Sequence, residues 1–413
     1  MSTRFTWMPG VVILVSLGLL AGCGGSHYKA SSDGLVIVPS QGAAVVQSFS
    51  FNLSTGHVST INSNPAIPGP PDQGTPASIV LDPTGSFAYV TSVSNPCSNA
   101  SVIATYAVKS DGTLSAIGSQ ALSANVYPTA LAIDSAGKYL FVSGNSTCAA
   151  GSVSVFSIGS NASLSEVPGS PFAVPTVLGA GTANLVALAV SPTTFPAQFA
   201  ACSSNTPPSS EFLYVADAQT NSVWEFAVSS TGSLVLPATG YTTGSIPSGV
   251  AIDPCNRFLY VSNQLSNNVS AFTVCASNSP TQTCSGNPAG TLVPVARFSA
   301  GSGPGPLVVS PFGNFLYVLD KTTNLISGEI SGFQISQASG SLTPTTPATT
   351  ATGNNPVSIA VRGDGNWLFV TNNGSSSGNG SLSQYIITPS SGALAPSGTG
   401  VLTDTYPWGI AVK

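Results

Sequence analysis

A two-strand phrase returns six times along this chain, and a seventh copy is divided between its two ends. The first copy runs from Pro76 to Val90, and the later complete copies start near Pro128, Asn184, Pro247, Pro306 and Pro356. The last copy, Pro407 to Lys413, stops after one strand, and residues 34–67 match the strands that it lacks. Repeats roughly 50 to 60 residues apart are typical of propeller blades. Because one repeat starts at the C-terminal end and finishes at the N-terminal end, the pattern predicts a closed ring.

Each repeat contains four short strand patterns. The first is a run of small apolar residues, as in Gly249 to Ile252, which is typical of a strand buried on both faces. The third alternates, as in Asn268 to Val274, and the fourth opens with Gly-x-Leu or a close variant. Turns of the Asp-Pro-x-Gly type, such as Asp82 to Gly85, join the first two strands. Four strands in seven repeats predict an all-β fold, a seven-bladed antiparallel β-propeller closed by a composite blade from residues 407–413 and 34–67.

The second strand of every complete repeat carries two aromatic residues two positions apart, which places both on one face of the strand. Sugar stacking is one possible role for such rings. Their presence in every repeat instead favours packing between blades. The pairs are Phe87 and Tyr89, Tyr139 and Phe141, Phe212 and Tyr214, Phe258 and Tyr260, Phe315 and Tyr317, and Trp367 and Phe369.

The N-terminal residues have the pattern of an export signal. Arg4 precedes an apolar stretch over residues 11–20, which is too short for an ordinary membrane-spanning helix. The following Leu-Ala-Gly-Cys resembles a bacterial lipobox, so we expect a signal peptide over residues 1–22 and a lipid on Cys23. An ordinary signal peptide with a chance cysteine is the alternative. Residues 23–33 then form a flexible tether, 34–413 form the propeller, and we expect the protein at the cell envelope, on the outer membrane.

Charged residues make up only 6% of the chain, and the formal net charge is −5. Nucleic-acid binding requires a basic face, so this composition argues against it. Apolar residues make up 42% and follow a regular pattern, which is sufficient for a core. We expect a monomer attached to a membrane by its lipid and able to bind a small molecule, a glycan or a protein.

Six cysteines remain after Cys23, an even number that suits disulfide bonds in an exported chain. Six cysteines allow 15 pairings, and the alignment of the blades selects one. It predicts Cys97 with Cys148 and Cys202 with Cys255, in matching loops of adjacent blades, and Cys275 with Cys284 across one loop. A metal site is the competing interpretation, but the sequence has no Cys-x-x-Cys and no nearby histidine.

Candidate functional residues gather where the channel of a propeller opens. Polar residues that follow the second strand and residues that precede the first strand lie at the same mouth. Asp72, Asp217, Asp320 and Asp404 are weak catalytic candidates, because crowded carboxylates can activate water or share a cation such as Ca²⁺. The alternative, which we favour, is that each Asp caps its own turn, because Asp is a common turn-forming residue. The binding candidates at the mouth are Asn263, Asn372, Tyr127, Tyr406, Trp408 and Lys321.

Other catalytic sets are not evident. His27 lies in the predicted tether and His57 at the start of an outer strand, away from the channel mouth. The sequence supports no Ser-His-Asp arrangement, P-loop or dinucleotide fingerprint, and we identify no cofactor.

The phrase from Pro247 to Asn263, followed by Asn-Val-Ser-x-Phe and Gly-x-Leu, resembles the lactonase-type seven-bladed propeller family, which includes 6-phosphogluconolactonase-like proteins. Phe369 to Asn372 is similar to the Tyr-Val-Thr-Asn repeats of related surface propellers. The resemblance spans residues 34–413 and implies this fold. Enzymes of the family are associated with Arg, Glu and His side chains around the channel, and none of these can be assigned to a position here.

Two functional hypotheses follow. The first is a cell-envelope lipoprotein that uses its propeller as a binding or interaction platform. The second is a lactone hydrolase that acts through acidic residues at the channel mouth. The sequence leaves open whether the protein is an enzyme.

Overall fold

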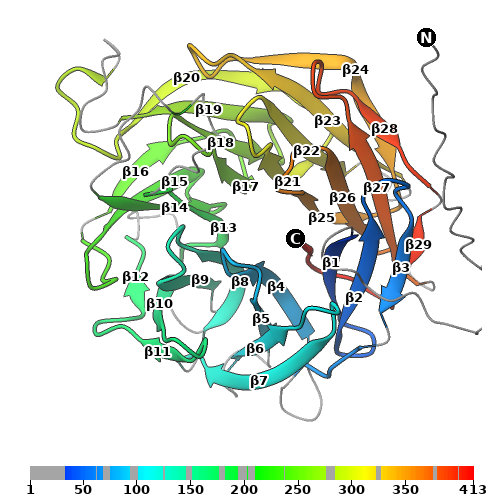
Figure 1. The fold of residues 1–413 in the computed structure, drawn as a ribbon. Coiled ribbons are helices and arrows are strands. Elements are labelled where there is room, and N and C mark those ends of the chain that lie inside the picture. The colour runs from blue at the N-terminus through cyan, green and yellow to red at the C-terminus, as the bar shows by residue number, and fades with distance from the viewer. Residues whose placement is uncertain are drawn as a thin grey trace, which may run out of the picture.

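The computed structural model describes residues 33–61, 63–67, 75–93, 101–123, 126–145, 151–175, 182–193, 202, 210–236, 238–275, 284–321, 327–374, 379–398 and 400–413. Seven antiparallel sheets stand around a central axis (Figure 1), which confirms the predicted seven-bladed β-propeller. The predicted signal peptide, Cys23 and most of the tether lie outside the described residues. Within the described ranges, no helix has the length and apolar character needed to cross a membrane.

In each sheet the first and second strands pair near the axis. The innermost strands are β4 (Thr75–Leu81), β8 (Tyr127–Ile133), β13 (Leu185–Val190), β17 (Pro247–Ile252), β21 (Pro304–Val309), β25 (Pro356–Val361) and β30 (Ala411–Val412). The second strands are β1 (Asp33–Ser40), β5 (Phe87–Val93), β9 (Tyr139–Asn145), β14 (Glu211–Asp217), β18 (Phe258–Asn263), β22 (Phe315–Lys321) and β26 (Trp367–Asn372).

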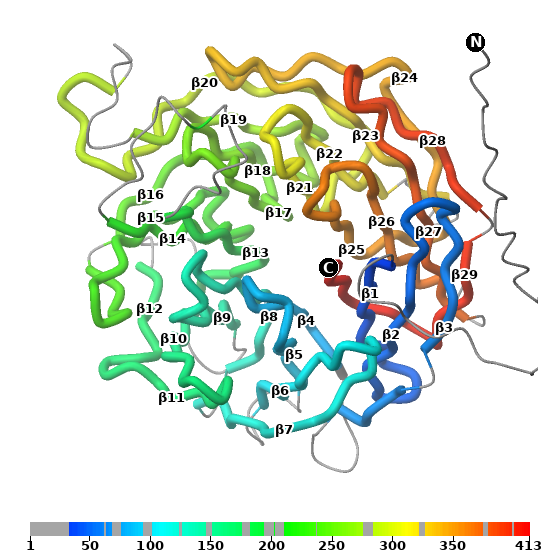
Figure 2. The backbone as a smooth tube through the Cα atoms, in the orientation of Figure 1, coloured from blue at the N-terminus to red at the C-terminus, as the bar shows by residue number. Residues whose placement is uncertain are grey.

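The third and outer strands complete each blade toward the perimeter, as the tube in Figure 2 shows. The third strands are β2 (Val45–Asn52), β6 (Val102–Val108), β10 (Ser152–Ile158), β15 (Ser222–Val228), β19 (Asn268–Val274), β23 (Gly328–Ile335) and β27 (Ser381–Ile387). The outer strands are β3 (Val58–Ile61), β7 (Leu114–Ala121), β16 (Thr239–Thr242), β20 (Leu292–Ser299) and β24 (Leu342–Thr352). In two sheets the outer strand is in two pieces, β11 (Leu164–Glu166) with β12 (Phe172–Ala173) and β28 (Leu394–Pro396) with β29 (Val401–Leu402).

The aromatic residues of the second strands form the seams between blades. Tyr260 is fully buried, and its hydroxyl donates a 3.0 Å hydrogen bond to the carbonyl of Gly340 in the next blade. Gly340 has a φ of +71°, and a Cβ there would lie 2.4 Å from the ring of Phe258. The same contact joins Tyr214 to Gly290 and Tyr317 to Gly392. The predicted packing role of the aromatic pairs is therefore confirmed, and it explains why the fourth strand opens with glycine.

The two ends of the chain close the ring in one blade. β30 pairs with β1 through Val36 with Val412 and Ile37 with Ala411. The order of this sheet, β3-β2-β1-β30, is that of the predicted composite blade. Figure 1 shows the C-terminus beside β1 near the centre of the ring.

The strand pairing moves the start of two repeats. Pro304, and not Pro306, pairs with Asp320 at the end of its second strand, because a register shift follows Pro304. In the third complete repeat, Leu185 rather than Asn184 pairs with Asp217. The spacing in the sequence agrees with the pairing of Pro304, because Pro304 lies six residues before Ser310, as Pro247 lies six residues before Asp253, whereas Pro306 lies only four residues before Ser310.

Two of the three predicted disulfide bonds are present. Cys202 bonds with Cys255, which joins matching connections of two adjacent blades, and Cys275 bonds with Cys284 across the β19–β20 connection. Cys97 and Cys148 lie outside the described residues. Disulfides persist in oxidising compartments, so these two bonds indicate an exported protein.

Candidate functional site

The predicted ring of positions after the second strands is regular in space. Each of these residues pairs with the first residue of the repeat on the innermost strand. The pairs are Pro76 with Ser92, Pro128 with Gly144, Leu185 with Asp217, Pro247 with Asn263, Pro304 with Asp320, Pro356 with Asn372 and Pro407 with Ser40. This end of the innermost strands is the predicted channel mouth.

Asp217 is fully buried, and both of its carboxylate oxygens accept hydrogen bonds from other groups of the protein. Oδ1 accepts hydrogen bonds from the amides of Asn184 (2.8 Å) and Gln219 (3.0 Å). Oδ2 accepts from the hydroxyl of Thr220 (2.7 Å) and the indole nitrogen of Trp224 (3.3 Å). The carboxylate therefore caps its own turn and joins that turn to the segment that enters β13.

Asp320 occupies the same repeat position with fewer partners. Its Oδ2 accepts a 2.6 Å hydrogen bond from the Ser331 hydroxyl, whereas its buried Oδ1 has no hydrogen-bond partner. Burial is the main cause that raises the pKa of Asp320 to about 7, and Glu329 on the paired strand adds to the effect. Burial also lowers the pKa of the adjacent Lys321.

Asn263 and Asn372 fill this position in two further blades and are also fully buried. The Asn263 amide donates to Asn268 Oδ1 (2.8 Å) and Ser270 Oγ (3.0 Å). The Asn372 amide donates to Ser383 Oγ (3.0 Å), and its Oδ1 accepts from Thr352. The Asn263 side chain therefore connects strands within one blade, whereas Asn372 also joins its blade to Thr352 on β24 of the preceding blade.

Glycines cover three of these four polar side chains. A Cβ at Gly244, Gly301 or Gly353 would lie 2.5–2.7 Å from the side chain of Asn263, Asp320 or Asn372, respectively. The chain that enters each innermost strand therefore passes directly over the polar group below it.

The remaining candidates are less buried. Tyr127, Tyr406 and Trp408 are exposed by 38, 39 and 41%. Asp404 is partly buried, and its Oδ1 accepts from the amide of Thr405 (2.7 Å). Asp72 lies outside the described residues.

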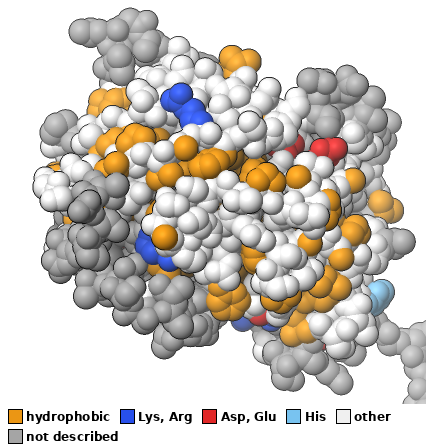
Figure 3. All heavy atoms as spheres, turned by 90° about the horizontal axis from the view of Figure 1, so that it is seen from above, with side chains coloured by type: hydrophobic (Ala, Val, Ile, Leu, Met, Phe, Trp, Pro, Cys, Tyr) orange, Lys and Arg blue, Asp and Glu red, His pale blue; other side chains and the backbone are white. Residues whose placement is uncertain are grey.

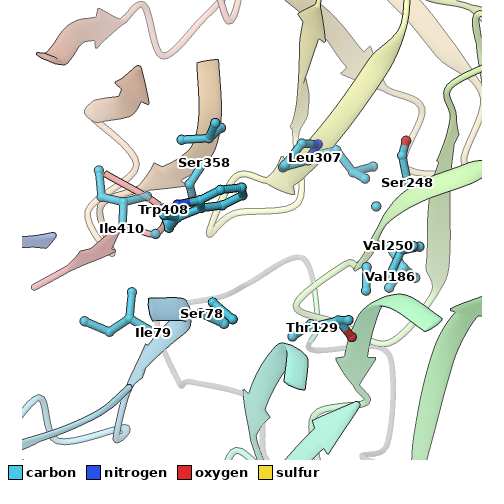
Figure 4. A pocket seen from close by; sticks show the side chains of 17 residues that line it. Ser78, Ile79, Thr129, Val186, Ser248, Val250, Leu307, Ser358, Trp408 and Ile410 are labelled. Atoms are coloured by element: carbon cyan, nitrogen blue, oxygen red, sulfur yellow. The ribbon is translucent and has the colours of Figure 1, made fainter. Parts of the chain in front are cut away.

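A pocket of about 200 Å³ follows the axis of the ring, and all seven blades contribute to its wall. None of the 17 residues that line it is ionisable. The wall contains the hydroxyls of Ser78, Thr129, Ser248 and Ser358. Figure 4 shows the indole of Trp408 extending into this space, with Thr129 and Ser248 across from it. Asp217 and Asp320 are not among the lining residues.

The channel hydroxyls were not among the candidates that the sequence suggested. They lie in the small apolar runs of the innermost strands, directly after or close to the first residue of each repeat, as Thr129 follows Pro128 and Ser248 follows Pro247. Because the residue after that start is Ala, Thr, Val, Ser, Gly or Trp in different blades, only the ring arrangement shows that residues near it face one space.

The described part of the molecule has few groups for acid–base or metal chemistry. No three His, Cys, Asp or Glu side chains gather there in a way that could hold a metal ion. Figure 3 shows scattered charged side chains among polar and apolar ones on one side of the ring. The predicted use of the mouth carboxylates, with or without Ca²⁺, stays a prediction.

The fold and the pocket together define a seven-bladed β-propeller with a central pocket on its axis. The sequence matches the family "Lactonase, 7-bladed beta-propeller" over residues 40–177, 183–288 and 281–399, and the chain belongs to that family. No curated protein matches it.

Several solved structures share the fold. A putative 6-phosphogluconolactonase from Bacteroides fragilis is 18% identical, with a TM-score of 0.71 over 93% of this chain and 99% of that chain. The periplasmic gluconolactonase of Pseudomonas aeruginosa is 18% identical, with a TM-score of 0.68 over 92% and 99%. A functionally unknown protein from Desulfotomaculum acetoxidans is 15% identical, with a TM-score of 0.65 over 92% and 98%. At these identities the likeness concerns the fold alone.

Proposed function

We propose that this protein binds a small neutral ligand at the mouth of its channel and does not turn it over. The observation that carries the proposal is the channel wall, whose 17 lining residues include no ionisable group. General acid–base catalysis requires such a group within hydrogen-bond reach of the reacting atoms. A wall of hydroxyl and apolar groups with one indole is suited to binding and orientation.

The test combines hydrolysis and binding with the purified protein. D-Glucono-1,5-lactone and 6-phosphogluconolactone are followed by pH-stat, with spontaneous hydrolysis subtracted. Binding of each is followed by calorimetry. We expect saturable binding of the neutral lactone, weaker binding of the phosphorylated one, and no hydrolysis above the blank. Hydrolysis above the blank by the purified protein overturns this proposal.

The second candidate function is lactone hydrolysis with Asp320 as general base. The observation in its favour is the buried carboxyl of Asp320, whose Oδ1 has no partner and whose pKa is raised to about 7. If hydrolysis is found, Asp320→Asn should abolish it. Unchanged hydrolysis in that variant rejects this role, and repeating the assay with calcium and with a chelator tests a bound cation.

The proposed location is the cell envelope, through a lipid on Cys23. The lipobox-like sequence before Cys23 and the two disulfides support it. Cys23→Ala should move the protein from the membrane fraction to the soluble exported fraction. If the variant stays with the outer membrane, the lipid is not the anchor.

A further inference from the structure

The residue directly before the first residue of the repeat adopts a left-handed conformation in four blades. These residues are Ile246, Gly303, Asn355 and Tyr406, with φ between +50° and +60°. Glycine and asparagine tolerate this conformation, whereas a β-branched or bulky residue is strained in it. Two blades therefore place a large apolar side chain where the backbone disfavours one.

Both strained side chains are exposed at the channel mouth. Ile246 and Tyr406 are each 39% exposed, and each lies two residues before a channel-lining residue, Ser248 and Trp408. Tyr127 stands in the same relation to Thr129 in another blade. Backbone strain tends to cluster at ligand-binding sites, so these strained and exposed side chains around a pocket are candidates for ligand contact.

Trp408 is held in one orientation at this mouth. Its indole nitrogen donates a 2.7 Å hydrogen bond to Gln41 Oε1, in the turn between β1 and β2. Its backbone amide donates to the carbonyl of Pro39. Since the N–H group is already bonded to the protein, the indole offers a ligand its ring face, and the ring is fixed before binding.

The hydroxyls of the wall complement this ring. Ser248 donates to the carbonyl of Pro304 (2.6 Å), and Thr129 Oγ1 is bonded to Ser143 (2.9 Å), so both oxygens keep lone pairs that can accept hydrogen bonds. Ser78 Oγ accepts from the amide of Leu131 (3.3 Å), which leaves its own proton for a ligand. The wall thus matches groups that both donate and accept, as alcohols do, and it offers no cation to an anion.

From these contacts we propose that the mouth binds a neutral sugar ring, with the C–H face of the sugar on Trp408 and its hydroxyls on the channel wall. The apolar side chains of Ile246, Tyr406 and Tyr127 surround the part of the ligand that remains at the rim. This inference rests on the proposed binding function and specifies its ligand class. A phosphorylated or carboxylated sugar should bind more weakly, because the residues that line the pocket carry no positive charge to compensate its charge.

The test measures binding of maltotriose, cellotriose and chitotriose by calorimetry, with glucose 6-phosphate and gluconate as charged probes. We expect saturable binding of at least one neutral trisaccharide and weaker binding of both charged probes. Trp408→Ala should lower that affinity by at least about tenfold, and Trp408→Phe, which keeps an aromatic face, by about threefold or less. Ile117→Ala, which alters an exposed residue on the outer strand β7, is the matched control and should leave binding unchanged.

The outcomes separate this inference from the proposed function. Hydrolysis of a lactone overturns the proposed function, whatever the saccharides do. If a neutral lactone binds but all three trisaccharides fail, or if Trp408→Ala binds like the parent, only the sugar-stacking inference is overturned. A thermal melt of each variant shows whether a loss of binding comes from unfolding, and Trp408→Phe keeps the inference testable if the alanine variant unfolds.

Discussion

The seams between the blades and the mouth of the channel are made by the same repeat, but three seams share one tyrosine–glycine contact, whereas equivalent residues at the mouth have different partners. At three seams a buried tyrosine donates to a glycine carbonyl of the next blade. At the mouth, one strand-end position holds Asp217 with four partners in one blade and Asp320 with an unpartnered oxygen in another. Regular positions therefore serve the fold, and departures from the repeat are the places to seek function.

The largest effect is expected at a seam, from Gly340→Ala. The new Cβ would lie 2.4 Å from the Phe258 ring, on a backbone with φ of +71°. Overpacking and left-handed strain together should lower the free energy of unfolding by about 4 kcal/mol. The shift in the urea midpoint measures it.

Gly286→Ala is the matched control for that seam. Gly286 also has a positive φ, of +85°, but a Cβ there meets nothing within 4 Å. Its replacement should cost only the backbone strain, about 1 kcal/mol. Equal losses in the two variants would show that the aromatic seam does not require glycine.

Asp320→Asn is expected to stabilise the protein at alkaline pH. Folding raises the pKa of this carboxyl from 3.8 to about 7. The contribution of Asp320 to the free energy of unfolding therefore falls as the pH rises from about 4 to 7, and it does not recover at higher pH. Asparagine carries no charge, and its amide can donate to Ser331 as Asn263 does to Ser270. At pH 8 the variant should be more stable by on the order of 3 kcal/mol, with little difference at pH 4.

Urea unfolding of both proteins between pH 4 and pH 8 provides the measurement. The difference between the two should grow through the interval in which Asp320 ionises. A constant difference across that range would mean that Asp320 does not titrate within it.

The architecture could be predicted from the sequence because every blade contains the same recognisable pattern of strands and turns. The aromatic pairs, the opening glycine and the divided last repeat are local signals that define seven blades and their closure. The positions of four cysteines within the aligned blades then predicted two disulfide bonds that the structure contains, Cys202 with Cys255 and Cys275 with Cys284.

The partners of the mouth residues could not be predicted in the same way. Asp217 and Asp320 occupy equivalent positions, yet their surroundings depend on the connection that enters the innermost strand. Gly301 passes over Asp320 from 19 residues away in sequence, and Gly244 and Gly353 lie at the same spacing from Asn263 and Asn372, but this spacing alone does not show that the glycine backbone covers the side chain. Whether a polar side chain at the mouth faces the channel or lies under the backbone is therefore a property of the folded ring.

Asp217→Asn should have the opposite effect from Asp320→Asn. The wild-type Oδ2 accepts from Thr220 and from the indole N–H of Trp224, and an amide group there would face that N–H with another donor. We expect a loss of about 2 kcal/mol in the free energy of unfolding, with no gain at alkaline pH. Chemical denaturation of the wild-type protein and the variant at pH 7 measures this loss. Two variants with effects of the same sign would remove the distinction between these positions.

The smallest effect, and the one that bears most on function, is expected from Ile246→Asn. Asparagine already occupies the equivalent left-handed position at Asn355, so the replacement should relieve strain and raise the free energy of unfolding by about 0.5–1 kcal/mol. The reverse change, Asn355→Ile, should cost a similar amount. If Ile246 contacts a ligand, Ile246→Asn should also weaken sugar binding about threefold while it stabilises the fold. A variant that gains stability and keeps its full affinity would show that the strain at the mouth serves no ligand.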